Sequence, residues 1–223
     1  MNDFIKVVII LFAINFVSCC STKECPRYFI VHAEILNPKI EYKVGDTISI
    51  VSNFSSIVSA VTSLPRISAG EYEMSGIDWE PVSRIYKVDS FGLHLESKTI
   101  NYVEFISNSN FNYSPYVFNS GNSWLNGEYN EDNGYFNLEV DFIAKEPGTY
   151  CLFQGSNLLT STQEFPDKCS GVGFDVEVIM NNGEDNNIDL LKESPNPHWN
   201  TRIFEKPDER FYRAGGYCFR IVE

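Results

Sequence analysis

The chain has 223 residues, of which 43% are hydrophobic and 14% aromatic, enough to bury a sizeable core. Seventeen Lys and Arg stand against 30 Asp and Glu, so the formal net charge is −13. A surface this acidic repels phosphate backbones, which argues against nucleic acid as a partner and against unaided binding to anionic membranes.

The N-terminus carries an apolar run at residues 7–17, which ends at Ser18-Cys19-Cys20. The run is shorter than the roughly 20 residues that span a bilayer as a helix, so it predicts a secretory signal rather than a transmembrane anchor. Phe16-Val17-Ser18-Cys19 resembles the lipobox of bacterial lipoprotein precursors, in the loose form found in Bacteroidota. This resemblance implies that residues 1–18 are removed and that Cys19 is lipidated. The lipid would then anchor the protein to the cell envelope, at the outer membrane.

The number of cysteines leaves Cys20 as an alternative lipidation site. If Cys19 takes the lipid, five cysteines remain and one thiol is spare, whereas lipidation of Cys20 leaves four, enough for two disulfides. The small residue before Cys19 favours Cys19, and the even number favours Cys20. We expect Cys19 to be modified and residues 19–27 to form a tether.

The other four cysteines are candidates for disulfides, because an exported chain folds in an oxidising compartment. They are Cys25, Cys151, Cys169 and Cys218. A bridge between Cys151 and Cys169 is slightly preferred, since these two bracket a loop between strands expected to be neighbours. No CxxC or CxxH spacing occurs, so neither a metal site nor a cofactor is predicted.

Residues 28–223 are predicted to form a single domain rich in strands. Strand patterns occur at residues 28–36, 47–51, 83–88, 102–106, 116–118, 135–142, 148–153, 172–178 and at the C-terminal end. The alternation is clearest in residues 135–142, where Phe136, Leu138, Val140 and Phe142 share one face. The same pattern in residues 172–178 places Glu177 on the polar face.

Helical signal is confined to a C-terminal excursion at residues 181–216. Residues 187–193 and 207–213 could each form about two turns, with Pro207 at the first helical position and Gly215 as a stop. Many short strands without a long helix predict an all-β fold, an antiparallel immunoglobulin-like β-sandwich with insertions in the long middle of the chain.

Two fragments resemble immunoglobulin-like bacterial surface modules. Residues 39–50 contain a Val-Gly-Asp-Thr turn that leads into a strand, and residues 146–152 read Glu-Pro-Gly-Thr-Tyr-Cys-Leu. The second resemblance implies that Tyr150 forms a tyrosine corner. Cys151 directly follows Tyr150, and neighbours on a strand point to opposite faces, so Cys151 should not form an inter-sheet disulfide.

No HExxH, GxSxG, P-loop or dinucleotide-binding motif is present, so no catalytic residue is predicted. Trp79, Trp124 and Trp199 all lie beside turn-forming residues. A Trp ring can stack on a sugar while neighbouring amides bind its hydroxyls, and Trp124 with Tyr129 in residues 119–133 is the candidate ligand site. Buried packing of each Trp is the alternative.

These features predict an envelope lipoprotein that acts as a non-catalytic binding or structural module. Its partner would be a glycan or another envelope protein. The alternative is an envelope-anchored hydrolase of polysaccharide or peptide. A hydrolase would need two well-placed carboxylates from an acidic set that includes Glu128, Glu131, Asp132, Glu139 and Asp141.

Overall fold

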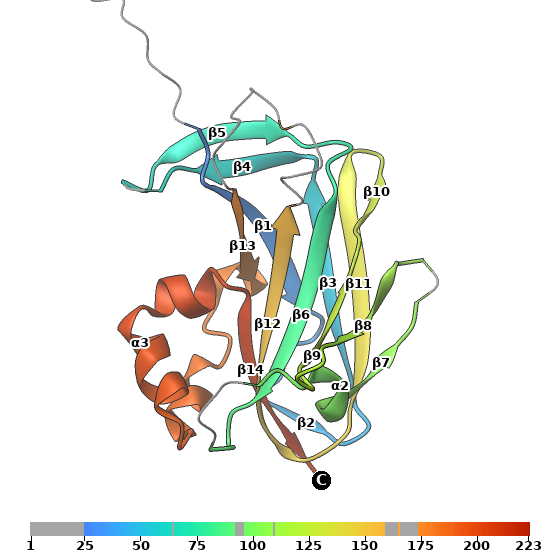
Figure 1. Cartoon of the computed structure of the whole chain (residues 1–223), viewed down its shortest axis with the longest axis vertical. Coiled ribbons are helices and arrows are strands. Elements are labelled where there is room, and N and C mark those ends of the chain that lie inside the picture. The colour runs from blue at the N-terminus through green and yellow to red at the C-terminus, as the bar shows by residue number, and fades with distance from the viewer. Residues whose placement is uncertain (1–24, 64, 92–95, 109, 159–164, 166–173) are drawn as a thin grey trace, which may run out of the picture.

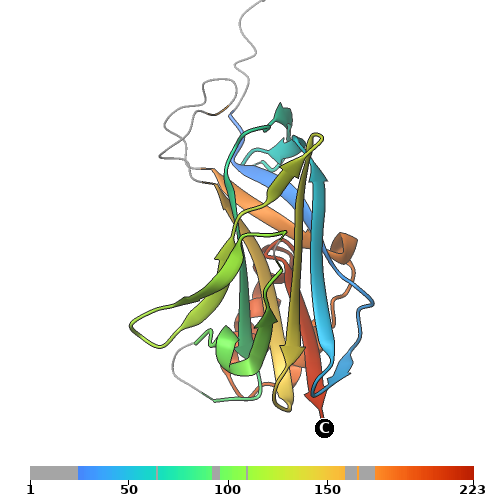
Figure 2. The same cartoon turned by 90° about the vertical axis from the view of Figure 1, so that its right-hand side faces the viewer.

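Two β-sheets packed face to face form the body of the protein in the computed structural model (Figure 1). The structure describes residues 25–63, 65–91, 96–108, 110–158, 165 and 174–223. Cys19, Cys20 and Cys169 therefore lie outside the described residues. Figure 2, turned by 90°, shows the long strands running along the longest axis of the molecule.

The first sheet has the spatial order β10-β11-β3-β1-β4-β5, with β13 added beside β1 and β7 beside β11. Its strands are β1 (Tyr28–Ile35), β3 (Thr47–Ser55), β4 (Ile57–Val61), β5 (Ser68–Glu73), β7 (Val103–Ile106), β10 (Asn130–Asp132), β11 (Tyr135–Ala144) and β13 (Asp175–Met180). β1 and β13 run parallel, and the other pairs in this sheet are antiparallel.

The second sheet has the order β2-β14-β12-β6-β9-β8. Its strands are β2 (Glu41–Lys43), β6 (Trp79–Lys87), β8 (Tyr113–Val117), β9 (Ser123–Gly127), β12 (Gly148–Leu158) and β14 (Gly216–Val222). Only the short β2 runs parallel to its neighbour β14 among these described strands. The predicted antiparallel immunoglobulin-like β-sandwich is confirmed, with one parallel pair in each sheet.

The main core lies between the sheets and is built by the predicted alternation. Phe136, Leu138, Val140 and Phe142 are all buried there. Tyr150 is also buried, and its Oη donates a hydrogen bond to the Glu146 carbonyl oxygen at 3.2 Å. This bond, from a strand back to the turn before it, is the predicted tyrosine corner.

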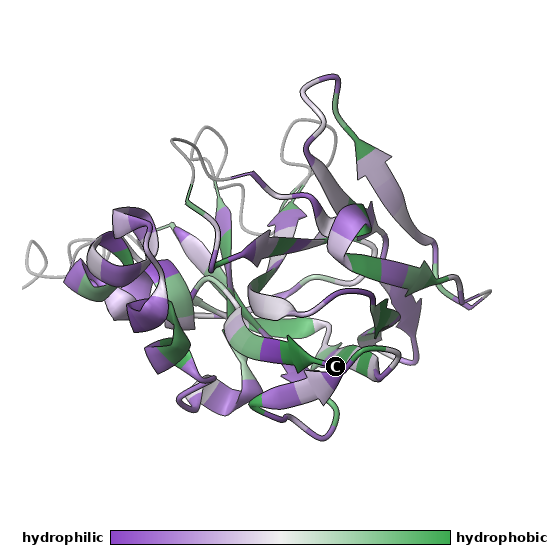
Figure 3. Ribbon diagram, turned by 90° about the horizontal axis from the view of Figure 1, so that it is seen from below, coloured by the Kyte–Doolittle hydropathy of each residue, from purple (hydrophilic) through white to green (hydrophobic). Residues whose placement is uncertain are grey.

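A second, smaller core lies on the outer face of the second sheet. It contains Cys151 and Cys218, so Cys151 does point away from Tyr150 as predicted. The elements that cover it lie between β13 and β14 and stand to one side of the sheets (Figure 3). We call this the helical segment; it comprises η2 (Asn181–Gly183), η3 (Ile188–Glu193), η4 (His198–Arg202), α3 (Ile203–Glu205) and η5 (Asp208–Tyr212).

The last turn of the helical segment, η5, is flanked by the proline and the glycine that the sequence predicts as its start and stop signals. Pro207 has helical backbone angles immediately before η5, and Gly215 follows that turn with φ of +68°. A Cβ at Gly215 would lie 2.0 Å from the Gln154 carbonyl oxygen, so only glycine allows the chain to pass this close to β12. Elsewhere, α2 (Thr99–Tyr102) is a single turn before β7.

Glu177 departs from the expected solvent-facing position. Its residue is only 6% exposed, because the guanidinium groups of Arg66 and Arg213 cover it. Arg66 Nη1 and Arg213 Nη1 lie 2.7 and 2.8 Å from Glu177 Oε1, and Arg66 Nη2 pairs with the other carboxylate oxygen. The alternation of residues predicted correctly on which face of β13 Glu177 lies. It does not reveal that two arginines from distant elements cover the Glu177 side chain.

We predict that Glu177→Ala lowers the free energy of unfolding by about 3 kcal/mol, because it leaves two guanidinium groups close together without their shared anion. Urea denaturation would measure the loss. Asp175→Ala is the matched control on the same strand, since its ion pair with Arg27 is exposed and should contribute less than about 1 kcal/mol. Equal losses for the two variants would contradict the importance of the Glu177 cluster.

Candidate functional site

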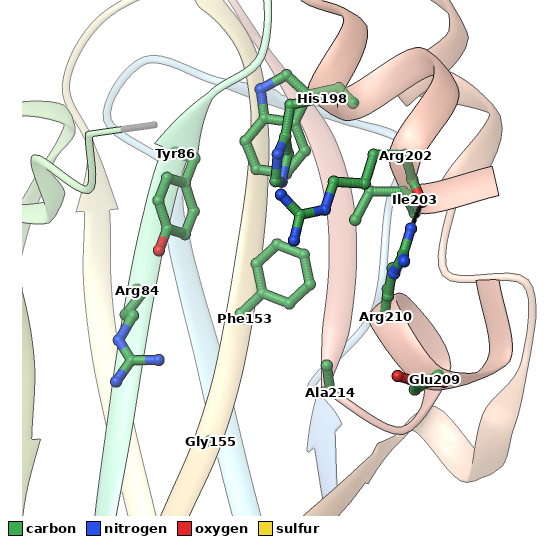
Figure 4. A pocket seen from close by; sticks show the side chains of 11 residues that line it. Arg84, Tyr86, Phe153, Gly155, His198, Arg202, Ile203, Glu209, Arg210 and Ala214 are labelled. Atoms are coloured by element: carbon green, nitrogen blue, oxygen red, sulfur yellow. Dashed lines mark hydrogen bonds between the residues drawn. The ribbon is translucent and has the colours of Figure 1, made fainter. Parts of the chain in front are cut away.

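A pocket of about 480 Å³ lies between the outer face of the second sheet and the helical segment. This volume is within the range of small-ligand sites. The lining residues are Arg84, Tyr86, Phe153, Gly155, His198, Trp199, Arg202, Ile203, Glu209, Arg210 and Ala214. Figure 4 shows Arg84 and Tyr86 on one side, His198, Arg202 and Arg210 on the other, and Phe153 between them.

The floor of the pocket follows from alternation in two paired strands. In β6, Ile85 points into the main core, so its neighbours Arg84 and Tyr86 point outward. In β12, Phe153 and Gly155 point outward, and Phe153 is the register partner of Arg84. Gly155 has no side chain, which leaves space in the floor.

The wall is held by Trp199, which is 2% exposed. Its ring stacks on Phe153 with centroids 6.2 Å apart and meets the Tyr86 ring edge-on at 5.5 Å. Ser194 connects this wall to the sheet, because its Oγ donates to the Val88 carbonyl oxygen at 2.6 Å. The buried packing that was the alternative for Trp199 is confirmed.

The pocket is cationic although the chain is acidic. All seven arginines lie in the described residues, and five of them pair with carboxylates: Arg27, Arg66, Arg210, Arg213 and Arg220. Arg84 and Arg202 make no ion pair with any described carboxylate, and both line the pocket.

Arg84 is the more constrained of these two arginines. Its Nε is buried and lacks a hydrogen-bond partner among the described residues, and its guanidinium lies 4.6 Å from the centroid of the Trp124 ring. A buried donor without an acceptor is costly, so the described fold leaves the hydrogen bonding of Arg84 incomplete. The one carboxylate in the lining, Glu209, lies 3.0 Å from Lys206 Nζ.

His198 contributes a further titratable group. Burial lowers its pKa below the ordinary value of 6.5, and the charges of Arg202 and Arg210 lower it further. The imidazole is therefore neutral at pH 7. A bound anion would oppose both arginine charges and so favour the protonated form.

The two residues predicted to form the ligand site do not share a face. Trp124 is half-buried on the outer face of β9, where Arg84 covers its ring and the Phe118 ring meets it edge-on at 4.1 Å. Tyr129 packs beside Phe54 and Phe136 of the main core, and burial raises its pKa to about 12. The structure thus shows neither an open Trp124 platform nor a joint site with Tyr129.

The described cysteines are Cys25, Cys151 and Cys218. Cys25 is disulfide-bonded. Cys151 and Cys218 are free, and their sulfur atoms lie 3.0 Å apart. The pairing of Cys151 with Cys169 stays a prediction, because Cys169 lies outside the described residues; among the described residues, β14 places Cys218 directly opposite Cys151.

Sequence reasoning missed Arg84 and Arg202, which come from elements far apart in the chain. One signal was available: four of the seven arginines fall within residues 202–220 of an otherwise acidic chain.

Among the described residues, no group of three or more His, Cys, Asp or Glu side chains could hold a metal ion. In the same part of the chain, no helix has the length and apolar character needed to cross a bilayer.

Comparison with known proteins finds likeness in structure alone. No protein-family model and no curated protein matches the chain. Among solved structures, a non-cellulosomal cohesin from Archaeoglobus fulgidus is similar with 13% identity and a TM-score of 0.32, over 89% of this chain and 93% of that one.

Two further similar structures are the human F-spondin reeler domain and a type II cohesin domain from the cellulosome of Acetivibrio cellulolyticus. The reeler domain is 8% identical with a TM-score of 0.31, over 73% of this chain and 91% of that one. The type II cohesin is 12% identical with a TM-score of 0.28, over 66% and 91%. At these values the function must be argued from the side chains of this chain.

We predict that His198 makes the fold less stable in mild acid. The pKa of His198 is lower in the folded chain than in the unfolded chain, so the unfolded chain binds the proton more readily. The contribution of the neutral imidazole to the free energy of unfolding is therefore complete above about pH 6.5 and is lost as the pH falls below that value. Melting temperatures at about pH 7.5 and about pH 5.5 would measure the loss, which should be smaller in His198→Gln. His32→Gln, at an exposed position on β1, is the control and should behave like the wild type.

Proposed function

We propose that this protein is an exported, lipid-anchored binding module that holds a carboxylate-bearing ligand in the pocket beneath its helical segment. The observation that carries the proposal is the pairing pattern of the arginines. Among the described residues, five of the seven arginines have carboxylate partners, and the two that have none there meet at one pocket.

The chemistry of these arginines selects the ligand. A guanidinium group presents a planar set of donors that matches a carboxylate, and such charge-assisted hydrogen bonds are about twice as strong as neutral ones. The chain has an excess of acidic residues, yet neither arginine is paired with any acidic residue that the structure describes. An external carboxylate would pair with the guanidinium charge of Arg84, which lines the pocket.

The aromatic floor suggests what carries the carboxylate. Tyr86 and Phe153 are half-buried, so part of each ring faces the pocket beside the cations. Aromatic faces beside fixed hydrogen-bond donors suit the C–H face of a sugar ring. We therefore favour an acidic sugar, that is, a polysaccharide unit that carries a carboxyl group. The glycan site is proposed at this pocket and no longer at Trp124.

Binding fits the pocket better than hydrolysis does. Glycoside hydrolysis needs two carboxyl groups that flank the scissile bond, whereas the lining contains only Glu209, which is paired with Lys206. A smaller pocket of about 120 Å³ beside Tyr129 has Asp78, Glu128 and Glu131 in its lining. There, Glu131 Oε2 accepts a hydrogen bond from the Gly76 amide.

We predict that the wild type binds tri-galacturonate, which carries one carboxylate per ring, and does not bind neutral maltotriose. Arg84→Gln and Arg202→Gln should each weaken binding about tenfold, because each removes a charged hydrogen bond. Isothermal titration calorimetry at low salt would measure this. Arg220→Gln is the matched control, since Arg220 pairs with Glu193 outside the pocket and its loss should leave affinity unchanged.

The result that would reject the acidic sugar is equal affinity for the charged and the neutral trisaccharide. Preference for an oligoglutamate peptide over the sugar would assign the carboxylate to a peptide instead. If both arginine variants bind as the wild type does, the pocket is not the binding site. Circular dichroism of each variant confirms that it is folded.

The anchor is proposed from the lipobox resemblance. We predict that the full precursor, expressed in a bacterium, enters the detergent phase of a phase-separation assay and that Cys19→Ser moves it to the aqueous phase. Several acyl chains hold a protein stably at a bilayer, and the acidic surface offers no other attachment. Cys20→Ser is the matched variant: if it alone abolishes partitioning, Cys20 is the modified residue.

A further inference from the structure

Cys151 and Cys218 occupy directly opposite positions on the antiparallel strands β12 and β14. Both residues are fully buried, and their Sγ atoms lie 3.0 Å apart. Within the described part of the chain, the Cys151 thiol makes one other hydrogen bond, a long one of 3.9 Å to the Leu152 carbonyl oxygen. Of the cysteines that the structure describes, each of these two sulfurs is therefore the nearest reactive partner of the other.

The hydrogen-bond pattern shows what kind of cross-strand pair this is. The Cys218 amide donates to the Asn186 carbonyl oxygen at 2.9 Å, and the Cys218 carbonyl accepts from Asn187 Nδ2 at 2.8 Å. Both backbone groups of Cys218 thus point away from β12. Cys151 and Cys218 form a non-hydrogen-bonded pair, in which opposite side chains approach most closely and the α-carbons are about 4.5 Å apart.

That separation lies inside the range that a disulfide requires, about 4.4–6.8 Å between α-carbons. No backbone movement is needed to join the two sulfurs. The pair differs in this from cysteines that merely lie in the same core, because here the strand register itself brings the two thiols together.

We propose that Cys151 and Cys218 form a cross-strand disulfide in the exported protein. Two S–H bonds break and one Sγ–Sγ bond forms. Two electrons and two protons pass to the disulfide of a thiol–disulfide oxidoreductase, which becomes a dithiol. The bridge closes the base of the small core on which the helical segment, and so one wall of the pocket, is packed.

We expect the bond to form before the helical segment closes over the strands, because both thiols are fully buried in the core that this segment covers. Burial raises the pKa of the Cys218 thiol well above its ordinary value, and the nearby Cys151 thiol raises it further, so the reactive thiolate is suppressed in the folded chain. Oxidation during folding on the outer side of the membrane avoids this barrier. The inference is independent of the ligand, so failure of the binding tests leaves it intact.

Peptide mapping of the wild type provides the first test. The protein is exported in a bacterium, denatured in excess alkylating reagent without reductant, digested and analysed by mass spectrometry. We expect a linked peptide pair containing Cys151 and Cys218, which disappears after reduction. Alkylation of both residues, or a link from either to another cysteine, would overturn the proposal. Cys25→Ala is the control that should leave the linked pair unchanged.

Melting temperatures provide the second test and separate the bond from simple packing. If the bond exists, Cys151→Ala, Cys218→Ala and the double variant should each lose about 5–15 °C, with no further loss in the double variant. Reduced, refolded wild type should lose a similar amount. Additive losses in the variants, together with a reduced wild type that melts at the original temperature, would mean that the thiols are packed but unbonded.

Discussion

Burial of the second sheet on both faces is the constraint on which the rest of this structure depends. β12 sends Tyr150 and Leu152 into the main core, and it sends Cys151 and Phe153 into the smaller core on the other side. A strand of an antiparallel sandwich usually faces solvent on one side. Because these outward residues are apolar, a cover is obligatory, and the helical segment supplies it. The pocket exists at the margin of that cover.

The alternation of apolar residues in strands and the positions of turn-forming residues predict most of the fold from the sequence. β11 alternates cleanly because one face meets the core. Pro207 fixes its own backbone angle φ, and Gly215 permits the positive φ that follows the turn. β4 and β5 were not predicted. The sequence of β5 is Ser-Ala-Gly-Glu-Tyr-Glu, and one of its six residues is buried, so β5 lacks an alternation of apolar and polar residues. Such an edge strand is stabilised by pairing with β4 rather than by its own pattern.

The site was less accessible to sequence reasoning, because it is assembled by register and not by a motif. Arg84 is adjacent to Phe153 only because β6 pairs with β12, and Arg202 reaches the same place from the helical segment. Trp124 attracted the prediction as a loop residue between turn formers. It lies instead within β9, where strand pairing brings it beside β6 and under the Arg84 guanidinium.

The position of β1 has a mechanical consequence. The chain enters the sandwich at Arg27, whose amide donates to the Val61 carbonyl of β4 and whose carbonyl accepts from the Asp175 amide of β13. From there β1 runs between neighbours and alongside β13 in parallel for six residue pairs, toward the end of the molecule where the C-terminus lies (Figure 1).

A pull on the N-terminus therefore acts along an interior strand and shears many hydrogen bonds together, rather than peeling an edge strand one bond at a time. Resistance to force is governed by the rate of unfolding, which such a shared load slows. With the proposed anchor at this end, the domain would withstand drag on the ligand proposed for its pocket.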